Sequence, residues 1–242
     1  MPVIDKNGNI FNSGCQTLVN TVNCDGVMGK GIALVYQCRY PELFIKYQEF
    51  CKKKLLTIGK LYLYKPQDES EPWVLNFPTK DHWNNPSKMK YIELGLKKFC
   101  ETYEKKGIKS IAFPMLGTNN GELDHDEVKA LMQDYLSKCN NIKIEIWEYD
   151  QSAHDDLFIN FKKIWLEKSN AIDQITREHN ITIHKKQIQT ITNALEQGNT
   201  YSMIDLIKQK SIGIVTMQKA YKIAKLIKTE NAISYEQLSM FN

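Results

Sequence analysis

Two kinds of segment alternate along residues 1–150, and this alternation limits the folds that the chain can adopt. Short runs rich in valine, isoleucine, leucine and aromatic residues favour β-strands, and longer stretches with apolar residues at helical spacing favour α-helices. The strand-like runs are residues 17–23, 60–64, 73–78, 110–116 and 143–149. The helix-like stretches are residues 41–54, 86–107 and 124–139. Repeated strand–helix alternation predicts a layered α/β domain, which binds ligands at the loops that follow its strands.

The strand-like runs stop at about residue 151, and only helix-like stretches follow. These are residues 156–168, 170–179, 184–198, 201–210 and 215–230. This second part holds 12 basic and 9 acidic residues, so it carries most of the net charge of +4, a mild excess that permits an anionic partner. We expect an α/β domain over residues 1–150 and a small all-helical, partner-binding domain over residues 151–242.

The composition is that of an ordinary soluble protein, with 42% apolar and 25% charged residues. No apolar run approaches the roughly 20 residues needed to cross a bilayer, and the first ten residues lack the layout of a signal peptide. We therefore expect a cytoplasmic protein that makes no membrane contact. The six cysteines form no C-x-x-C pair, so we expect buried free thiols, with neither a metal nor a cofactor.

A glycine-rich loop follows the first strand-like run, and it contains Gly26, Gly29 and Gly31, with Lys30 between the last two. It does not match a P-loop, because Ile32 stands where serine or threonine is required, and it lacks the third glycine of a dinucleotide fingerprint. Glycines between a strand and a helix still expose backbone N–H groups to an anion. The loop is therefore either a phosphate-binding turn or a tight turn without a ligand.

A second glycine-bearing loop follows the fourth strand-like run. Gly117 and Gly121 enclose three small polar residues that can donate hydrogen bonds to a phosphate, namely Thr118, Asn119 and Asn120. Two such loops after two strands predict a pyrophosphate that is held from both sides.

Three segments carry a resemblance to a known family. They read LVNTVNCDGVMGKGIAL at residues 18–34, NFPTKDHW at residues 76–83 and PMLGTNNGELDHDEV at residues 114–128. Together they resemble the macrodomains of the DNA ADP-ribosyl glycohydrolase antitoxins known as DarG. The resemblance covers about residues 1–150 and implies a macrodomain-like mixed sheet between helices. Its members remove ADP-ribose from DNA bases that the partner toxin, DarT, has modified.

The resemblance also implies roles for individual residues. Lys80 is expected to act in catalysis together with Asn23, which holds the distal ribose. Asn9 stands where the family has an adenine-binding aspartate, and its uncharged oxygen implies weaker binding of adenine. The residues expected to contact ADP-ribose are Asn9, Ile10, Asn23, Gly29, Lys30, Gly31, Ile32, Thr79, Gly117, Thr118, Asn119, Asn120, Gly121, Glu122 and Leu123.

The residues after the run 73–78 suit cleavage of an N-glycosidic bond. Such cleavage passes through an oxocarbenium-like state, which a nucleophile at the anomeric carbon can trap. Lys80 follows an apolar run, where burial favours the neutral amine that attack requires, although a lysine taken alone is more often a solvated surface residue. Trp83 is expected to stack on the extruded DNA base, with His82 positioning or protonating it, unless Trp83 packs under the loop.

Two charged segments each have a plainer explanation beside a functional one. The acidic residues within 122–127 are expected to cap a helix rather than to hold a metal. Four lysines recur every three residues opposite an apolar side, and they form either a solvated face or a contact with DNA or with an acidic toxin surface. The lysines are Lys219, Lys222, Lys225 and Lys228, and the apolar residues are Ile223, Leu226 and Ile227.

The last residues of the chain carry a second, shorter resemblance. Gln237–Phe241, which read QLSMF, resemble the Q-L-[SD]-L-F peptide by which bacterial replication and repair proteins bind the sliding clamp. Leu238, Met240 and Phe241 would be the apolar anchors and Gln237 the polar contact. Packing of the tail on its own helical domain, or contact with the toxin, are the alternatives.

Taken together, the sequence predicts a macrodomain enzyme that releases ADP-ribose from modified bases in single-stranded DNA. It would act as the antitoxin to a DarT-like toxin, with thymine and guanine both open as the modified base. A module that binds ADP-ribose without cleaving it, and a hydrolase of ADP-ribosylated protein glutamate, are the alternatives.

Overall fold

The computed structural model describes residues 3–167 and 169–239, and it describes the side chains of these residues apart from 169, 170 and 230–239. The chain divides into two compact units, residues 1–150 and residues 151–242. Each unit is described separately.

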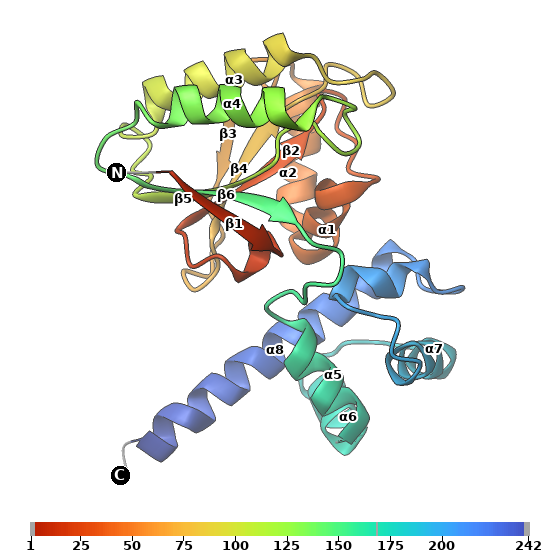
Figure 1. Ribbon diagram of the computed structural model, residues 1–242. Coiled ribbons are helices and arrows are strands. Elements are labelled where there is room, and N and C mark those ends of the chain that lie inside the picture. Colours follow the sequence, from red (N-terminus) through yellow and green to blue (C-terminus); the bar gives the residue numbers. More distant parts are fainter. Residues whose placement is uncertain (1–2, 168, 240–242) are drawn as a thin grey trace. The chain divides into compact units, whose positions relative to one another are not determined.

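The first unit is built on a six-stranded mixed sheet (Figure 1), which confirms the layered α/β domain predicted from the strand–helix alternation and the mixed sheet implied by the resemblance. In spatial order the strands are β1 (Ile4–Gly8), β6 (Lys143–Tyr149), β5 (Ser110–Pro114), β2 (Thr17–Val22), β4 (Trp73–Pro78) and β3 (Tyr62–Tyr64). The first five are parallel, and β3 runs antiparallel to β4 at one edge. The carboxyl ends of the five parallel strands therefore lie at the same edge of the sheet.

Strand β1 was not predicted, and its sequence explains why. It reads IDKNG, pairs only with β6, and exposes its three central polar residues. An edge strand of this kind shows neither an apolar run nor the alternation that identifies a half-buried strand.

Helices cover both faces of the sheet (Figure 1). One face carries α3 (Met89–Thr102) and α4 (His125–Leu136), which pack with strand residues such as Val19 and Phe77. The other face carries α1 (Gly31–Arg39), α2 (Pro41–Lys52) and the short η1 (Ile10–Asn12), and alternate strand residues such as Leu18 and Val74 point into it. The helices α2, α3 and α4 lie within their predicted stretches.

The helix α3 approaches the sheet very closely at one position. A Cβ atom on Gly95 would lie 2.1 Å from Cζ of the Phe77 ring, so only glycine allows this contact. Because α3 begins directly after the loop that carries Lys80, this contact fixes the base of that loop.

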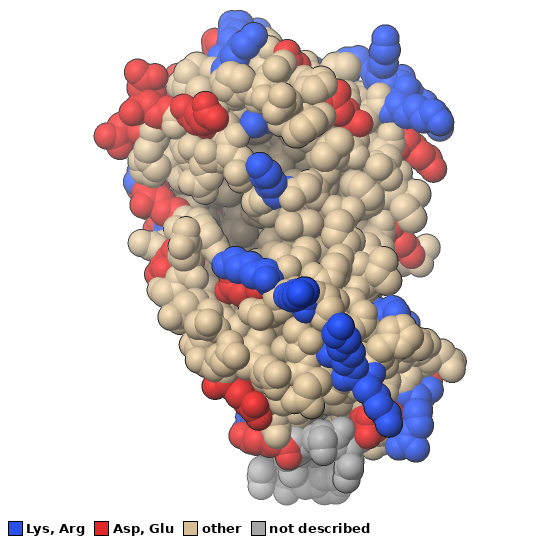
Figure 2. Space-filling view, turned by 90° about the vertical axis from the view of Figure 1, so that its right-hand side faces the viewer, with Lys and Arg blue, Asp and Glu red and all other residues tan. Residues whose placement is uncertain are grey.

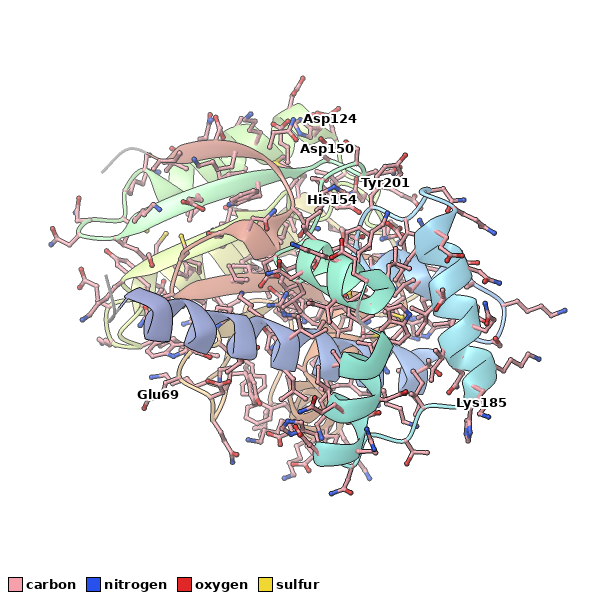
Figure 3. The ribbon with its side chains drawn as sticks, turned by 90° about the horizontal axis from the view of Figure 1, so that it is seen from below. Glu69, Asp124, Asp150, His154, Lys185 and Tyr201 are labelled. Carbon is pink, nitrogen blue, oxygen red and sulfur yellow. The ribbon has the colours of Figure 1, made fainter. Side chains whose placement is uncertain are left out.

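The second unit contains only helices among its described residues. They are α5 (Phe158–Glu167), α6 (Ser169–Glu178), α7 (Lys185–Glu196), the 3-10 helix η2 (Met203–Lys208) and α8 (Ile214–Ser239). Its core includes Phe161, Trp165, Leu195 and Tyr221. A buried carboxylate, Asp155, accepts hydrogen bonds from the backbone N–H groups of Leu157 (3.0 Å) and Met203 (2.7 Å). Figure 3 shows His154 beside Tyr201, whose carbonyl oxygen contacts its Nδ1 atom.

The six cysteines are free thiols, as expected, and four of them are buried. Cys24 and Cys100 are half-buried, and the Sγ atoms of Cys100 and Cys139 lie 3.2 Å apart although the sequence separates them by 39 positions. Burial raises the pKa of Cys24 and of Cys38 to about 12.

None of the described helices combines the length and the apolar character that crossing a membrane requires.

Candidate functional site

Three loops converge at the carboxyl ends of adjacent parallel strands. The first loop (residues 23–30) joins β2 to α1, the second (79–88) joins β4 to α3, and the third (115–124) joins β5 to α4. Because β5, β2 and β4 are neighbours in the sheet, the loops leave it side by side. Figure 2 views the side to which these loops point.

The first loop is shaped by the side chain of Asn23, which is 9% exposed. Its Oδ1 atom accepts hydrogen bonds from the N–H groups of Asp25 (2.9 Å) and Val27 (3.3 Å) and from the hydroxyl of Tyr47 (2.9 Å). Its Nδ2 atom donates to the carbonyl of Val27 at 2.6 Å. An amide group has two N–H donors, so these contacts leave one for a ligand. Asn23 is therefore an organiser of the loop as well as a candidate ribose contact.

The second loop is tied to the first at two points. The N–H of Thr79 donates to the carbonyl of Val22 (2.9 Å), which extends the pairing of β2 and β4 into the loops. The N–H of Trp83 donates to Oδ2 of Asp25 at 2.8 Å, and Nε2 of His82 lies 3.7 Å from the same carboxylate oxygen. Trp83 is 52% exposed, so its indole is open to a ligand instead of packing under the loop.

The third loop contacts both of the others, and its glycines are required for this. The N–H of Ser87 donates to the carbonyl of Gly121 (3.0 Å), and a Cβ atom on Gly121 would lie 2.3 Å from Oγ of Ser87. Gly31, at the start of α1, has a φ of +57°, and a Cβ atom there would lie 2.6 Å from Nδ2 of Asn120. The two glycine-bearing loops thus lie against each other.

The acidic residues at the end of the third loop form a helix cap, as expected. Asp124 is the N-cap of α4, and its carboxylate accepts from the N–H groups of Asp126 and Glu127, both at 3.0 Å. Glu122, two residues before this N-cap, adopts a φ of +64°, which is unusual for a residue with a side chain.

Lys80 lies at the junction of strand β4 and the second loop, and it is half-buried. The neighbouring Asp81 accepts hydrogen bonds from Nδ2 of Asn85 (3.2 Å) and from the hydroxyl of Tyr91 on α3 (3.0 Å). These hydrogen bonds, of which the one from Asn85 has the largest effect, hold the pKa of Asp81 below its usual value. Asp81 is therefore a carboxylate at neutral pH. Lys80 is therefore placed on a backbone that is anchored on both sides.

The segment after β1 brings Asn9 and Ile10 to the same edge of the sheet. Asn9 is the N-cap of η1, and its Oδ1 atom already accepts from the N–H of Phe11 (3.2 Å), which leaves one lone pair of this oxygen for a further donor. The end of this segment is fixed by Glu145 on β6, whose carboxylate accepts from Ser13 (2.7 Å). Burial raises the pKa of Glu145, but bonds from Lys143, Ser13 and Trp147 outweigh this and lower it to about 2.

The remaining predicted contact residues lie in the three loops. Lys30, Asn119, Asn120 and Glu122 are exposed, Thr79 and Gly121 are buried, and Gly117, Thr118 and Leu123 are half-buried. Ile32 is half-buried in the first turn of α1.

Sequence patterns did not reveal the residues that hold the loops together. Asp25, Tyr47 and Ser87 connect positions that are far apart in the sequence, such as Trp83 and Asp25 at a separation of 58. Of these residues, only Asp25 could have been suspected from the sequence, because it lies between Asn23 and Gly26 in a loop that was already a candidate site.

The chain was compared with known protein families and proteins. The family model described as "Macro domain" matches residues 19–132. A protein named DNA ADP-ribosyl glycohydrolase from Mycobacterium tuberculosis is 45% identical over 123 residues, which cover 50% of this chain and 35% of that protein. One of the same name from Thermus aquaticus is 38% identical over 144 residues, which cover 59% and 39%. The chain thus spans well under half of these relatives.

Solved structures agree with these matches. The macrodomain of Mycobacterium tuberculosis DarG superposes with a TM-score of 0.57 at 38% identity, over 60% of this chain and 97% of that one. The Thermosipho africanus DarTG structure in complex with ADP-ribose gives a TM-score of 0.56 at 43% identity, over 58% of this chain and 40% of that one.

Proposed function

Because the chain belongs to the macrodomain family and is related to the DarG DNA ADP-ribosyl glycohydrolases, we propose that it removes ADP-ribose from modified bases in single-stranded DNA. The observation that carries the proposal is the meeting of the three loops. It places Lys80, the exposed Trp83 and two touching glycine-bearing loops at one edge of the sheet.

The loops would hold the ligand in a fixed orientation before the bond is cleaved. The glycines of the first and third loops present backbone N–H groups to the pyrophosphate, and the N-terminus of α1 favours its negative charge. Asn23 would orient the distal ribose through its remaining N–H, and Asn9 would accept from the adenine amino group. Orientation of this kind supplies a large part of the rate enhancement in many enzymes.

Lys80 would act as the nucleophile. Once deprotonated, its Nζ atom would attack the anomeric carbon of the distal ribose; the glycosidic C–N bond breaks, and its electron pair passes to the base nitrogen, which takes up a proton. Water then displaces the amine and gives free ADP-ribose. Trp83 would stack on the departing base, and His82 would position or protonate it.

The proposed biological role is that of an antitoxin to a DarT-like toxin. A Thermosipho africanus relative, 41% identical over 156 residues, is named as a fusion of a DNA ADP-ribosyl transferase and a DNA ADP-ribosyl glycohydrolase. The second unit would bind the partner toxin. The sliding-clamp contact through Gln237–Phe241 stays a proposal from the sequence, since Met240 and Phe241 lie outside the described residues.

The experiment that tests the function uses a single-stranded oligonucleotide modified with ADP-ribose on one base. Incubation with the full chain is expected to release free ADP-ribose and the unmodified oligonucleotide, measured by mass spectrometry. Binding without release would make the protein a reader of ADP-ribose. Release only from a peptide that carries ADP-ribosyl glutamate would make it a protein hydrolase, and either result overturns the proposal.

A further inference from the structure

Three helices of the second unit follow one another in the order of a helix-turn-helix. The short helix η2 is followed by the turn 209–213 and then by the long helix α8. The turn contains the buried Ile212, and Ser211 within it adopts a φ of +78°. Short helix, tight turn and longer helix is the arrangement in which the second helix enters the major groove of DNA.

Helix α7 packs against the turn and the start of α8 and fixes their position. Nε2 of Gln187 donates to Oγ1 of Thr216 (2.7 Å), and Oγ1 of Thr190 lies 3.3 Å from Oγ of Ser211. The start of α7 lies at the outside of the unit, where Figure 3 labels Lys185. The three helices therefore form one supported element.

Helix α8 carries four lysines, of which Lys222 and Lys228 are exposed and Lys219 and Lys225 are half-buried. Its buried side contains Met217, Ala220, Tyr221, Ile223, Ala224 and Ile227. Val215, 64% exposed, Lys219 and Lys222 follow each other at spacings of four and three on the other side. Leu226, four residues after Lys222, is half-buried on this same side, so the prediction that it lies opposite the lysines was wrong.

The charge of this region is one-sided. Residues 206–229 contain six lysines and no acidic residue. Within the unit, Lys228 pairs with Asp156 (2.8 Å) and Lys208 pairs with Asp205 (2.6 Å). Lys210, within the turn, is exposed, and Nζ of Lys222 lies 3.5 Å from the carbonyl of His179, at the long limit of a hydrogen bond.

We propose that α7, η2 and α8 form a helix-turn-helix surface that binds duplex DNA independently of ADP-ribose. The start of α8 enters the major groove, with Val215 toward the base edges and Lys210, Lys219 and Lys222 on phosphates. DNA is favoured over an acidic protein surface because the exposed apolar side chain of Val215 lies among the lysines, which suits a groove lined by phosphates. This site does not rest on the glycohydrolase activity.

The test measures binding of the full chain to an unmodified, fluorescein-labelled DNA duplex by anisotropy, at salt concentrations from about 50 to 200 mM. We expect a dissociation constant in the micromolar range, about 10⁻⁴ to 10⁻⁶ M, which weakens steeply with salt. The variant Lys219→Glu/Lys222→Glu is expected to bind at least about tenfold more weakly and to show a salt slope reduced by about 2. A matched control, Lys105→Glu/Lys106→Glu in the first unit, changes the net charge equally and should retain most of the affinity.

Two measurements keep the outcome clear. Circular dichroism and the affinity for free ADP-ribose show that each variant is folded, and neither depends on duplex binding. The proposal is overturned if the full chain shows no salt-dependent binding to the duplex, or if both double variants lose affinity equally. It is also overturned if the lysines of α8 matter only for binding the purified toxin, which would assign this face to a protein partner.

Discussion

The two units are expected to bind their ligands by different physical means. In the first unit, three loops are joined by short contacts such as those of Trp83 with Asp25 (2.8 Å) and Ser87 with Gly121 (3.0 Å). In the second, lysines on long flexible stems surround the start of one helix. The first arrangement recognises a ligand by the position of individual atoms, and the second recognises an anionic surface by its charge density.

This difference has consequences for experiment. A site built on position should be sensitive to single atoms and little affected by salt, since few of its contacts are exposed charges. A site built on charge should tolerate exchange of one lysine for another cation but lose affinity when salt is added. The following predictions test the site in the first unit, which we expect to recognise its ligand by the position of individual atoms, from the largest expected effect to the smallest.

Replacement of Lys80 by alanine is expected to have the largest effect. Release of ADP-ribose from modified single-stranded DNA should fall by at least about a thousandfold, because a proposed nucleophile is removed. The affinity for free ADP-ribose, measured by calorimetry, should stay unchanged, because the loops that hold the ligand are intact. Lys97→Ala, at an exposed position of α3 outside the three loops, serves as the control. Turnover within tenfold of the original in Lys80→Ala would remove the nucleophile assignment.

The second prediction concerns the buried carboxylate of Glu145. Its pKa is about 2 in the folded protein, below the ordinary value of 4.5, so its stabilising contribution is complete above that value and is lost as the pH falls toward 2. Glu145→Gln should lower the free energy of unfolding by about 3 kcal/mol at pH 7, and the difference should shrink toward zero near pH 2. Urea denaturation across this pH range measures it, with the exposed Glu104→Gln as the control.

If Glu145→Gln lowers the free energy of unfolding by the same amount at every pH, packing and not the carboxylate charge stabilises this region. Ser13, which donates to Glu145, ends the segment that carries Asn9 and Ile10. The affinity for adenosine diphosphate ribose is therefore expected to fall with the stability.

Much of the sheet was predictable because its strands are buried on both faces. The run 73–78 coincides with β4, whose last five residues are all buried, and such a strand appears as a continuous apolar run. Strand β1 was missed because only the pairing with β6 makes it a strand. Residues 201–210 were predicted as helical, but only Met203–Lys208 form a helix, and that helix is of the 3-10 type.

The candidate site was predictable to the extent that glycine positions reveal it. Gly31 and Gly121 occupy positions where a Cβ atom would collide with another loop, and a glycine in a loop is a visible sign of such a place. The bonds of Asp25 and Ser87 were not predictable, because they join loops that the sequence keeps far apart. The role of Asn23 as an organiser of its own loop was also missed, although three of its contacts are local bonds to Asp25 and Val27, and only that with Tyr47 of α2 joins distant positions.

The third prediction concerns Asp25, which holds the backbone of Trp83. A hydrogen bond to a charged group contributes about 1.5 kcal/mol, so Asp25→Ala should lower kcat/KM on modified DNA by about tenfold. The affinity for free ADP-ribose should be nearly unchanged, because the expected effect is on the base-contacting indole. In the Trp83→Ala background the Asp25 substitution should add almost nothing, and an additive loss would show that Asp25 acts through another group.

The smallest effect is expected for Gly29→Ala, and its interest lies in what it leaves unchanged. A Cβ atom on Gly29 would meet only Cγ1 of Val27, at 3.9 Å, and the residue does not have a positive φ, so the protein itself does not require glycine there. The melting temperature should therefore stay within about 1 °C, while the affinity for ADP-ribose falls by about threefold to fivefold if the pyrophosphate approaches this backbone.

Gly31→Ala is the matched comparison, because Gly31 combines a φ of +57° with a Cβ position 2.6 Å from Asn120. It should lose about 1 kcal/mol of stability as well as affinity. If Gly29→Ala binds ADP-ribose as tightly as the original protein, the ligand does not approach the first loop at this residue. The positional account would then rest on Gly31 and the third loop, where the glycines are already explained by contacts within the protein, and the first loop would serve to orient Asn23 and not to hold the phosphates.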